Sequence, residues 1–285
     1  KNFKQMNDLS LSNLSTLSNK DEYNTEIYKR NNYFKSIKTI PWVETKLQFN
    51  QNPVFMIGFP RSGTTLLDSI LRSHPLVEII EEKPIIDALI LSINKFTGGY
   101  IEKLNKLNDS NLKELQNLYF EKRESYLDTD SVNKIIIDKL PLNIVYIPEI
   151  IRIFPNSKFI LSLRHPYDCI LSCYFQNFKL NSSMLNFLKL EDSANFYNLV
   201  MQMWAKYNQI FKPEICELKY EDLIYSFEHS VRKVLNFLEI QWTDEIYNFN
   251  DNAKKRRITT PSYYQVTEPI NSRAIDRWKN YELQI

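Results

Sequence analysis

Short apolar runs alternate with longer segments of helical period from Pro53 onward, and this alternation limits the fold more than any other feature of the sequence. Runs this short have the length of buried strands, whereas helices are usually about ten residues or longer. The runs predicted to be strands cover residues 54–57, 77–80, 134–137, 158–163 and 215–218. The segments predicted to be helices cover residues 64–73, 84–96, 111–126, 144–154, 166–176, 191–211 and 221–238. Strands separated by helices form a parallel sheet with right-handed crossovers, so the sequence predicts an α/β fold with a central parallel sheet flanked by helices.

Residues 1–50 differ from the rest of the chain because they are polar, rich in Asn and Ser, and carry apolar residues at only loose helical spacing. They are predicted to be an N-terminal helical arm or a linker, or the end of a truncated repeat region, and residues 51–285 are predicted to be the functional domain. The first residue is Lys1 and not Met, which predicts a fragment of a longer protein. The segment from Asp251 onward is basic and is predicted to be mostly irregular.

Composition excludes several classes of protein. Hydrophobic residues make up 43% and charged residues 25% of the chain, which is typical of a globular protein. Lys and Arg number 36 against 34 for Asp and Glu, so charge gives no indication of a nucleic-acid partner. Three cysteines form neither a disulfide framework nor a zinc-site spacing, and they favour a reducing, cytoplasmic location. No apolar run reaches the roughly 18 residues that a membrane span needs.

A glycine-bounded loop follows the first predicted strand and leads into a helix. Its residues are Gly58-Phe59-Pro60-Arg61-Ser62-Gly63-Thr64-Thr65. Such a loop points several backbone N–H groups at one place, and the helix dipole adds to their attraction for phosphate. The Gly-x4-Gly spacing is that of the nucleotide-binding P-loop, but Thr64 stands where that motif has lysine, and Arg61 supplies a positive charge instead. The alternative is a Gly/Ser/Thr turn without function.

Charged residues follow the second and third predicted strands. Glu81 and Glu82 are two adjacent carboxylates that would lie near the phosphate loop, where one of them could act as a general base. Their spacing alone favours a solvated turn, and only their position after the strand points to a catalytic role. Asp138 could be a magnesium-holding residue of an NTPase. Lys139 could supply charge to a phosphate, or both could belong to a surface turn.

The fourth predicted strand ends at Arg164, and Ser172 lies two turns into the helix that follows. The two could clamp one anion, because the planar guanidinium of arginine binds phosphate in a bidentate manner. His165 could act as an acid or base, but a single histidine in a turn is more often structural. The basic run 254–257 and the pair Arg277-Trp278 are not specific on their own.

Taken together, these stretches resemble the sulfotransferases that use 3′-phosphoadenosine 5′-phosphosulfate (PAPS). The likeness is strongest to the bacterial tetratricopeptide-repeat-linked sulfotransferases and the protein-tyrosine sulfotransferases. The matching stretches run in order from residue 53 to residue 283: PVFMIGFPRSGTTLLDSILRSHP, IDKLPLN, FPNSKFILSLRHPYDCILSCYFQNF, KYEDL and TTPSYYQVTEPINSRAIDRWKNYE. The resemblance implies a P-loop-type three-layer fold and an enzyme that needs PAPS and no metal.

The resemblance also implies roles for individual residues. Glu82 corresponds to the catalytic base of the family, with Glu81 as the alternative, and Arg61 and Lys139 correspond to groups that neutralise charge in the reaction. The residues that correspond to the cofactor site are Arg61, Ser62, Gly63, Thr64, Thr65, Arg164, Ser172, Tyr220, Ser262 and Arg277. The expected reaction is in-line transfer of the sulfuryl group to an acceptor hydroxyl on a protein tyrosine, a carbohydrate or a small molecule.

The sequence departs from the family at positions that concern the acceptor. Protein-tyrosine sulfotransferases carry arginines just past the catalytic carboxylate, where this chain has Pro84 and Ala88, and the nearest cation is Lys83. Recognition of acidic peptides is therefore in doubt, while the cofactor residues are untouched. Two other functions stay open: a P-loop kinase or NTPase that uses Asp138, and a catalytically silent nucleotide-fold interaction module.

Overall fold

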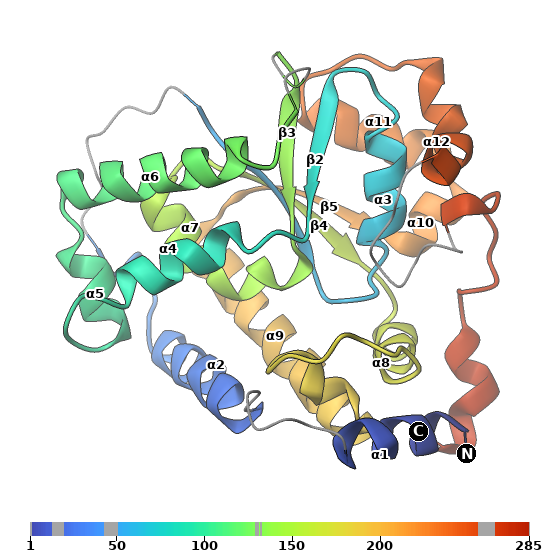
Figure 1. Cartoon of the computed structure of the whole chain (residues 1–285), viewed down its shortest axis with the longest axis horizontal. Helices are drawn as coiled ribbons and strands as arrows, with labels where there is room; N and C mark the ends of the chain where they lie inside the picture. The colour runs from blue at the N-terminus through green and yellow to red at the C-terminus, as the bar shows by residue number, and fades with distance from the viewer. Residues whose placement is uncertain are drawn as a thin grey trace.

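A computed structural model of the chain describes residues 2–12, 20–42, 51–128, 131, 133–255 and 266–284. Its centre is a parallel sheet of five strands in the order β2-β3-β1-β4-β5 (Figure 1). The strands are β1 (Val54–Gly58), β2 (Val77–Glu81), β3 (Ile135–Lys139), β4 (Lys158–Leu163) and β5 (Glu214–Lys219). The predicted α/β fold with a parallel sheet is confirmed, and each predicted strand is present within two residues of its predicted bounds.

The position of β1 explains why its sequence is a continuous apolar run. It pairs with β3 on one side and β4 on the other, and all of its residues are buried. A strand that is covered on both faces needs apolar side chains on both faces, not an alternating pattern. The loop that follows β1 therefore starts at the middle of the sheet, beside the carboxyl ends of two neighbouring strands.

Helices cover both faces of the sheet and complete three layers (Figure 1). One hydrophobic core lies between the sheet and α2, α4, α6, α7 and α9, and a second lies between the sheet and α3, α11 and α12. The α-helices are α1 (Asn2–Ser12), α2 (Lys20–Lys35), α3 (Thr64–Leu71), α4 (Ile85–Ile93), α5 (Tyr100–Lys106), α6 (Asp109–Glu124), α7 (Ile147–Ile153), α8 (Pro166–Tyr174), α9 (Leu190–Phe211), α10 (Tyr220–Tyr225), α11 (Phe227–Phe237) and α12 (Phe249–Lys255). The 3₁₀ helices are η2 (Pro141–Tyr146), η3 (Met184–Phe187), η4 (Asp244–Asn248) and η5 (Arg277–Gln284).

Two predicted helices are divided in the structure. The segment 221–238 breaks at Ser226, whose φ of −136° and ψ of 53° are not helical, so that α10 and α11 are separate. The segment 144–154 begins as the 3₁₀ helix η2, and the α-helix proper starts beside Pro148, which has no N–H to donate and is tolerated only in a first turn. The basic end is more regular than predicted, because it contains α12 and η5.

The N-terminal helix α2 packs into the same core as the sheet. Its Ile27 and Phe34 are 1% exposed and belong to the core cluster that includes α9. Arg30 forms a buried ion pair with Glu149 of α7, and its guanidinium also lies 4.4 Å from the centre of the Tyr100 ring. Residues 20–35 thus contribute to the interior, whereas the domain boundary at residue 51 remains a prediction.

Within the described ranges, no helix combines the length and the apolar character that crossing a bilayer requires. The three cysteines are buried free thiols, and burial raises the pKa of Cys169 to about 12.

Candidate functional site

The glycine loop between β1 and α3 is held in shape from both sides. Gly63 has a φ of +103°, and a Cβ at this position would lie 2.7 Å from the Tyr220 ring, so only glycine fits there. From β4, the Ser162 hydroxyl donates to the Ser62 carbonyl at 2.9 Å. The loop thereby leads directly into the first turn of α3, whose backbone N–H groups form the phosphate-attracting end of the helix.

Arg61 and Arg164 come together at this loop with Ser172. The Arg61 Nε donates to the Ser172 hydroxyl at 3.0 Å, and the Arg164 Nη1 donates to the Arg61 carbonyl at 3.0 Å. The Arg164 guanidinium also lies 4.9 Å from the centre of the Tyr220 ring. Burial lowers the pKa of Arg61, and the nearby charge of Arg164 acts in the same direction. Two cations held this close favour an anion between or beside them.

The C-terminal segment completes the surroundings of Arg164. The Arg164 Nη2 donates to the carbonyl of Ala274. Asp168 on α8 anchors this segment, since its carboxylate accepts from the backbone N–H groups of Asp276 at 2.9 Å and Trp278 at 3.0 Å. Sequence reasoning missed Ala274 and Asp168, because a backbone carbonyl and an anchoring carboxylate leave no motif.

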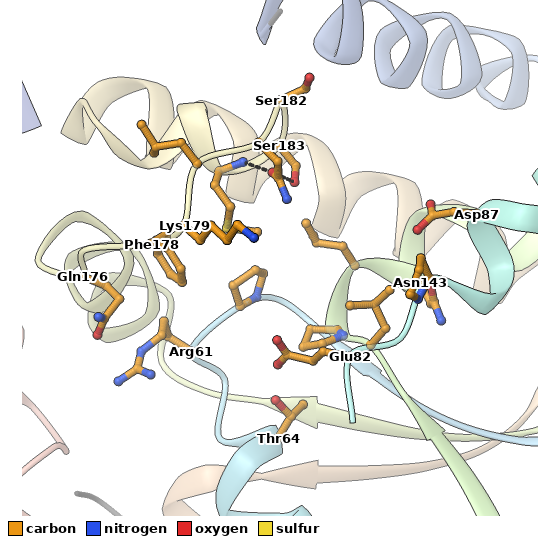
Figure 2. A pocket seen from close by; sticks show the side chains of 18 of the residues that line it. Arg61, Thr64, Glu82, Asp87, Asn143, Gln176, Phe178, Lys179, Ser182 and Ser183 are labelled. Atoms are coloured by element: carbon orange, nitrogen blue, oxygen red, sulfur yellow. Dashed lines mark hydrogen bonds between the residues drawn. The ribbon is translucent and has the colours of Figure 1, made fainter. Parts of the chain in front are cut away.

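A cavity of about 1000 Å³ opens beside the loop. Its walls come from the loop, the turn after β2, η2, the segment 176–184 and α2 (Figure 2). The predicted site residues that line it are Arg61, Gly63, Thr64, Thr65 and Glu82. Figure 2 shows Glu82 between Arg61 on one side and Asn143 and Asp87 on the other.

Glu82, and not Glu81, lines the cavity. Its backbone has a φ of +50°, and its N–H donates to the Lys139 carbonyl at 2.8 Å. Burial raises the pKa of Glu82 above its usual value, and the charge of Lys139 opposes that rise. A carboxylate with a raised pKa at the wall of a cavity is suited to accept a proton.

Lys139 lies behind Glu82 with no exposed surface. Its ammonium is 3.0 Å from Glu81, 3.3 Å from Asp68 and 3.6 Å from Glu82. Burial acts to lower the pKa of Lys139, but these three carboxylates raise it above its usual value, so that the ammonium stays charged. Lys139 is not one of the residues that line the cavity.

The remaining predicted residues are placed as follows. Ser62 is buried in the loop, and its hydroxyl has no hydrogen-bond partner among the described residues. Tyr220 packs against both Gly63 and Arg164. Arg277 lies over the Phe175 ring, 5.5 Å from its centre, and is not among the cavity-lining residues. Ser262 lies outside the described residues.

Asp138 faces away from the loop. It is 1% exposed, and its carboxylate interacts with Tyr119 of α6 on the other face of the sheet. Among the residues that the structure describes, no group of three or more His, Cys, Asp and Glu side chains is placed to hold a metal ion. The geometry therefore gives no support to Asp138 as a magnesium-holding residue.

The strand–loop–helix unit, the paired arginines and the carboxylate-lined cavity give this α/β protein a candidate anion-binding site at the carboxyl end of its sheet. The profile of the Sulfotransferase family matches residues 53–244, which is more than half of the chain. The chain therefore belongs to the sulfotransferase family.

The chain is also similar to individual relatives and, in its fold, to a solved sulfotransferase domain. An uncharacterized protein of Aquifex aeolicus is 31% identical over 241 residues, which is 82% of this chain and 31% of that protein. Protein-tyrosine sulfotransferase 2 of Gallus gallus is 25% identical over 235 residues, which is 79% of this chain and 62% of that protein. The chain thus spans less than two thirds of either relative. The sulfotransferase domain of the Synechococcus PCC 7002 olefin synthase shares the fold, with a TM-score of 0.52 at 19% identity over 84% of this chain and 90% of that domain.

Proposed function

We propose that this protein transfers the sulfuryl group of PAPS to an acceptor hydroxyl, with Glu82 as the general base. The observation that carries the proposal is the cluster of Arg61, Arg164 and Ser172 at the glycine loop, beside a cavity that Glu82 lines. The arginine cluster at the glycine loop suits a phosphorylated nucleotide, and the cavity at Glu82 suits a nucleophile that must lose a proton.

The residues present fit a doubly phosphorylated nucleotide. The Ser62 Oγ and the Arg164 Nε are buried and have no hydrogen-bond partner among the described residues, and both are donors. Phosphate oxygens are acceptors and would satisfy both groups. In this proposal Arg164 and Ser172 hold the 3′-phosphate, and residues 61–65 hold the 5′-phosphosulfate. Ser262 and Arg277 stay proposed cofactor contacts on the resemblance alone, whereas Tyr220 also has its packing against Arg164.

When bound, PAPS supplies the sulfuryl group and the phosphate that leaves. Glu82 accepts the proton of the acceptor hydroxyl. Arg61 and the amide groups of the loop stabilise negative charge on the phosphate side, a preorganised arrangement that is typically worth about 2.7–4 kcal/mol per group. Lys139 is fully buried among three carboxylates, which supports a role in holding Glu82 in position. Lys139 then acts on the reaction only through Glu82.

Isothermal titration of adenosine 3′,5′-bisphosphate and AMP tests the cofactor site. Because Arg164 is proposed to hold the 3′-phosphate, we expect Arg164→Ala to weaken bisphosphate binding at least tenfold more than AMP binding. Arg232→Ala, which removes an exposed arginine of α11, is the control and should change neither affinity. Equal losses for the two nucleotides, or tighter binding of ATP-Mg²⁺ than of the bisphosphate, would overturn the proposal.

A further inference from the structure

The cavity wall beyond Glu82 combines apolar residues with neutral polar ones and carries little charge, and it is where an acceptor would lie. Resting on the proposed function, we propose that the acceptor is a neutral polyhydroxylated compound, a carbohydrate, which the wall recognises through amides, hydroxyls and aromatic rings. The inference concerns the side of the cavity that the cofactor residues do not occupy.

The first observation is Asn143 on η2. Its side chain is 1% exposed, it lines the cavity, and neither its amide oxygen nor its amide nitrogen has a hydrogen-bond partner among the described residues. Its backbone is fixed, because its N–H donates to the Leu140 carbonyl at 2.9 Å. Buried polar groups of proteins are nearly always paired, so an unpaired amide at a cavity wall points to a ligand.

The chemistry of the Asn143 amide limits the class of ligand that can pair with it. A primary amide offers a donor and an acceptor side by side, whichever way the group is turned. Neighbouring hydroxyls of a sugar can each donate and accept, and therefore pair with both. A carboxylate only accepts and would leave the amide oxygen unpaired.

Neutral polar residues also occur on the remaining wall, beside apolar ones. The segment 176–184 contributes Phe178, Leu180 and Met184 together with the neutral polar residues Gln176, Asn177, Asn181, Ser182 and Ser183. This segment is braced internally, since the Asn181 Oδ1 accepts from the Ser183 hydroxyl at 2.8 Å and from the Met184 N–H at 2.9 Å.

Aromatic rings face the same cavity from two other elements. Tyr23 of α2 and Tyr146 of η2 both line it, and burial raises the pKa of Tyr146 to about 12, so that its ring stays uncharged. Flat rings with a polar tip pack against the apolar faces of sugar rings while their hydroxyls find hydrogen bonds.

Charge argues against an acidic acceptor. Figure 2 shows Asp87 at the same end of the cavity as Asn143. The charged residues among those that line the cavity are Arg61, Glu82, Asp87 and Lys179. Arg61 belongs to the phosphate side, which leaves Lys179 against two carboxylates on the acceptor side. A peptide with several carboxylates would meet repulsion there.

The test uses the whole chain with radiolabelled PAPS and a defined panel of acceptors. The panel contains neutral mono-, di- and trisaccharide glycosides, a peptide with one tyrosine among neutral residues, and a peptide with one tyrosine among glutamates. We expect label on at least one glycoside, at a rate at least tenfold above either peptide. Preferential labelling of either peptide, or no labelled glycoside, would overturn the inference.

Nucleotide binding separates this inference from the proposed function. If the bisphosphate binds in an Arg164-dependent manner while no glycoside is labelled, the carbohydrate inference fails and the proposed function stands. If the bisphosphate does not bind, the proposed function fails first.

Asn143→Leu tests the residue itself. We expect the KM for the labelled glycoside to rise at least tenfold, with bisphosphate affinity unchanged within twofold and a melting temperature that is not lowered. Gln116→Leu is the matched control, because Gln116 is a buried amide whose nitrogen donates to the Ile153 carbonyl at 2.8 Å, away from the cavity. The Gln116→Leu variant should have a lower melting temperature and an unchanged KM. An unchanged KM in Asn143→Leu would remove Asn143 from acceptor binding.

Discussion

At the scale of single residues, Lys139 is a buried cation that interacts with several carboxylates at once, including that of Glu82. A lone ammonium without exposed surface is costly, and the carboxylates of Asp68, Glu81 and Glu82 offset that cost. The acids outnumber the cation, so Lys139 opposes but does not cancel the rise in the pKa of Glu82 that burial causes. Glu82 is left as a carboxylate that takes up a proton more readily than an ordinary glutamate.

The pH dependence of turnover tests Glu82 as the base. Because its pKa is raised, the wild-type kcat/KM should fall on acidification at a pH above the usual 4.5 of a glutamate, as the base becomes protonated. Glu82→Gln should lower kcat by about 10²–10⁴-fold and lose this acid limb, while the affinity for adenosine 3′,5′-bisphosphate is unchanged. Glu78→Gln, which alters a carboxylate of β2 outside the cavity, is the control. Normal turnover in Glu82→Gln would exclude Glu82 as the base.

The ionisation of Asp138 should make the free energy of unfolding depend on pH. Burial raises its pKa to about 7, and the nearby Tyr119 hydroxyl acts in the opposite direction. The folded state therefore holds this proton more tightly than the unfolded chain, where the pKa is about 3.9. The free energy of unfolding is therefore unaffected by Asp138 below about pH 4. It falls as the pH rises toward 7, and the loss is complete above about pH 7.

Asp138→Asn should remove that loss. We expect the variant to gain free energy of unfolding relative to wild type as the pH rises from about 4 to 8, by at most about 4 kcal/mol at 1.36 kcal/mol per pKa unit. Urea titrations at several pH values measure the difference, and Asp128→Asn, at an exposed position, serves as the control. A difference that does not vary with pH would show that Asp138 does not titrate in this range.

At the scale of elements, α2 is fixed by an ion pair that the sequence pattern does not reveal. Arg30 and Glu149 are 119 positions apart, both are nearly unexposed, and the two pair in the interior. The guanidinium also lies over the rings of Tyr100 and Tyr146, at 4.4 and 5.1 Å from their centres. Since Tyr146 and Tyr23 line the cavity, the same ion pair helps to fix one of its walls.

Removing one partner of this ion pair should lower the free energy of unfolding more than replacing both partners with apolar residues. Arg30→Met leaves the Glu149 carboxylate buried alone, and we expect it to lower the free energy of unfolding by about 3–5 kcal/mol. The double variant Arg30→Met/Glu149→Leu should recover most of that loss, because apolar side chains fill the same space. Arg232→Met, which breaks the exposed pair with Glu228, should change stability by less than about 1 kcal/mol. A double variant no more stable than the single one would contradict this explanation.

At the scale of the whole molecule, the sequence predicted those features that local pattern determines. The five strands follow from buried apolar runs, and the glycine loop follows from the residues that a phosphate nest requires. The association of Arg61 with Arg164 and Ser172 was also predictable, since parallel strands end at one edge of the sheet. The family resemblance supported the same residues.

The features that the sequence did not predict depend on contacts between distant segments. The polar pattern of residues 20–35 hides the few apolar positions that enter the core, such as Ile27 and Phe34. The cavity wall of segment 176–184 and Asn143 has no motif, because neutral polar residues are common in loops. Neither the choice of Glu82 over Glu81 as the cavity-lining carboxylate nor the burial of Lys139 could be read from adjacent positions in the sequence.

Arg164 reaches back 103 positions to the carbonyl of Arg61 and forward 110 positions to that of Ala274. A ribosome that has made the glycine loop has therefore not yet made the arginine that braces it, and the second carbonyl emerges later still. A nascent chain can therefore form this braced geometry only after the segment that holds Ala274 has been made.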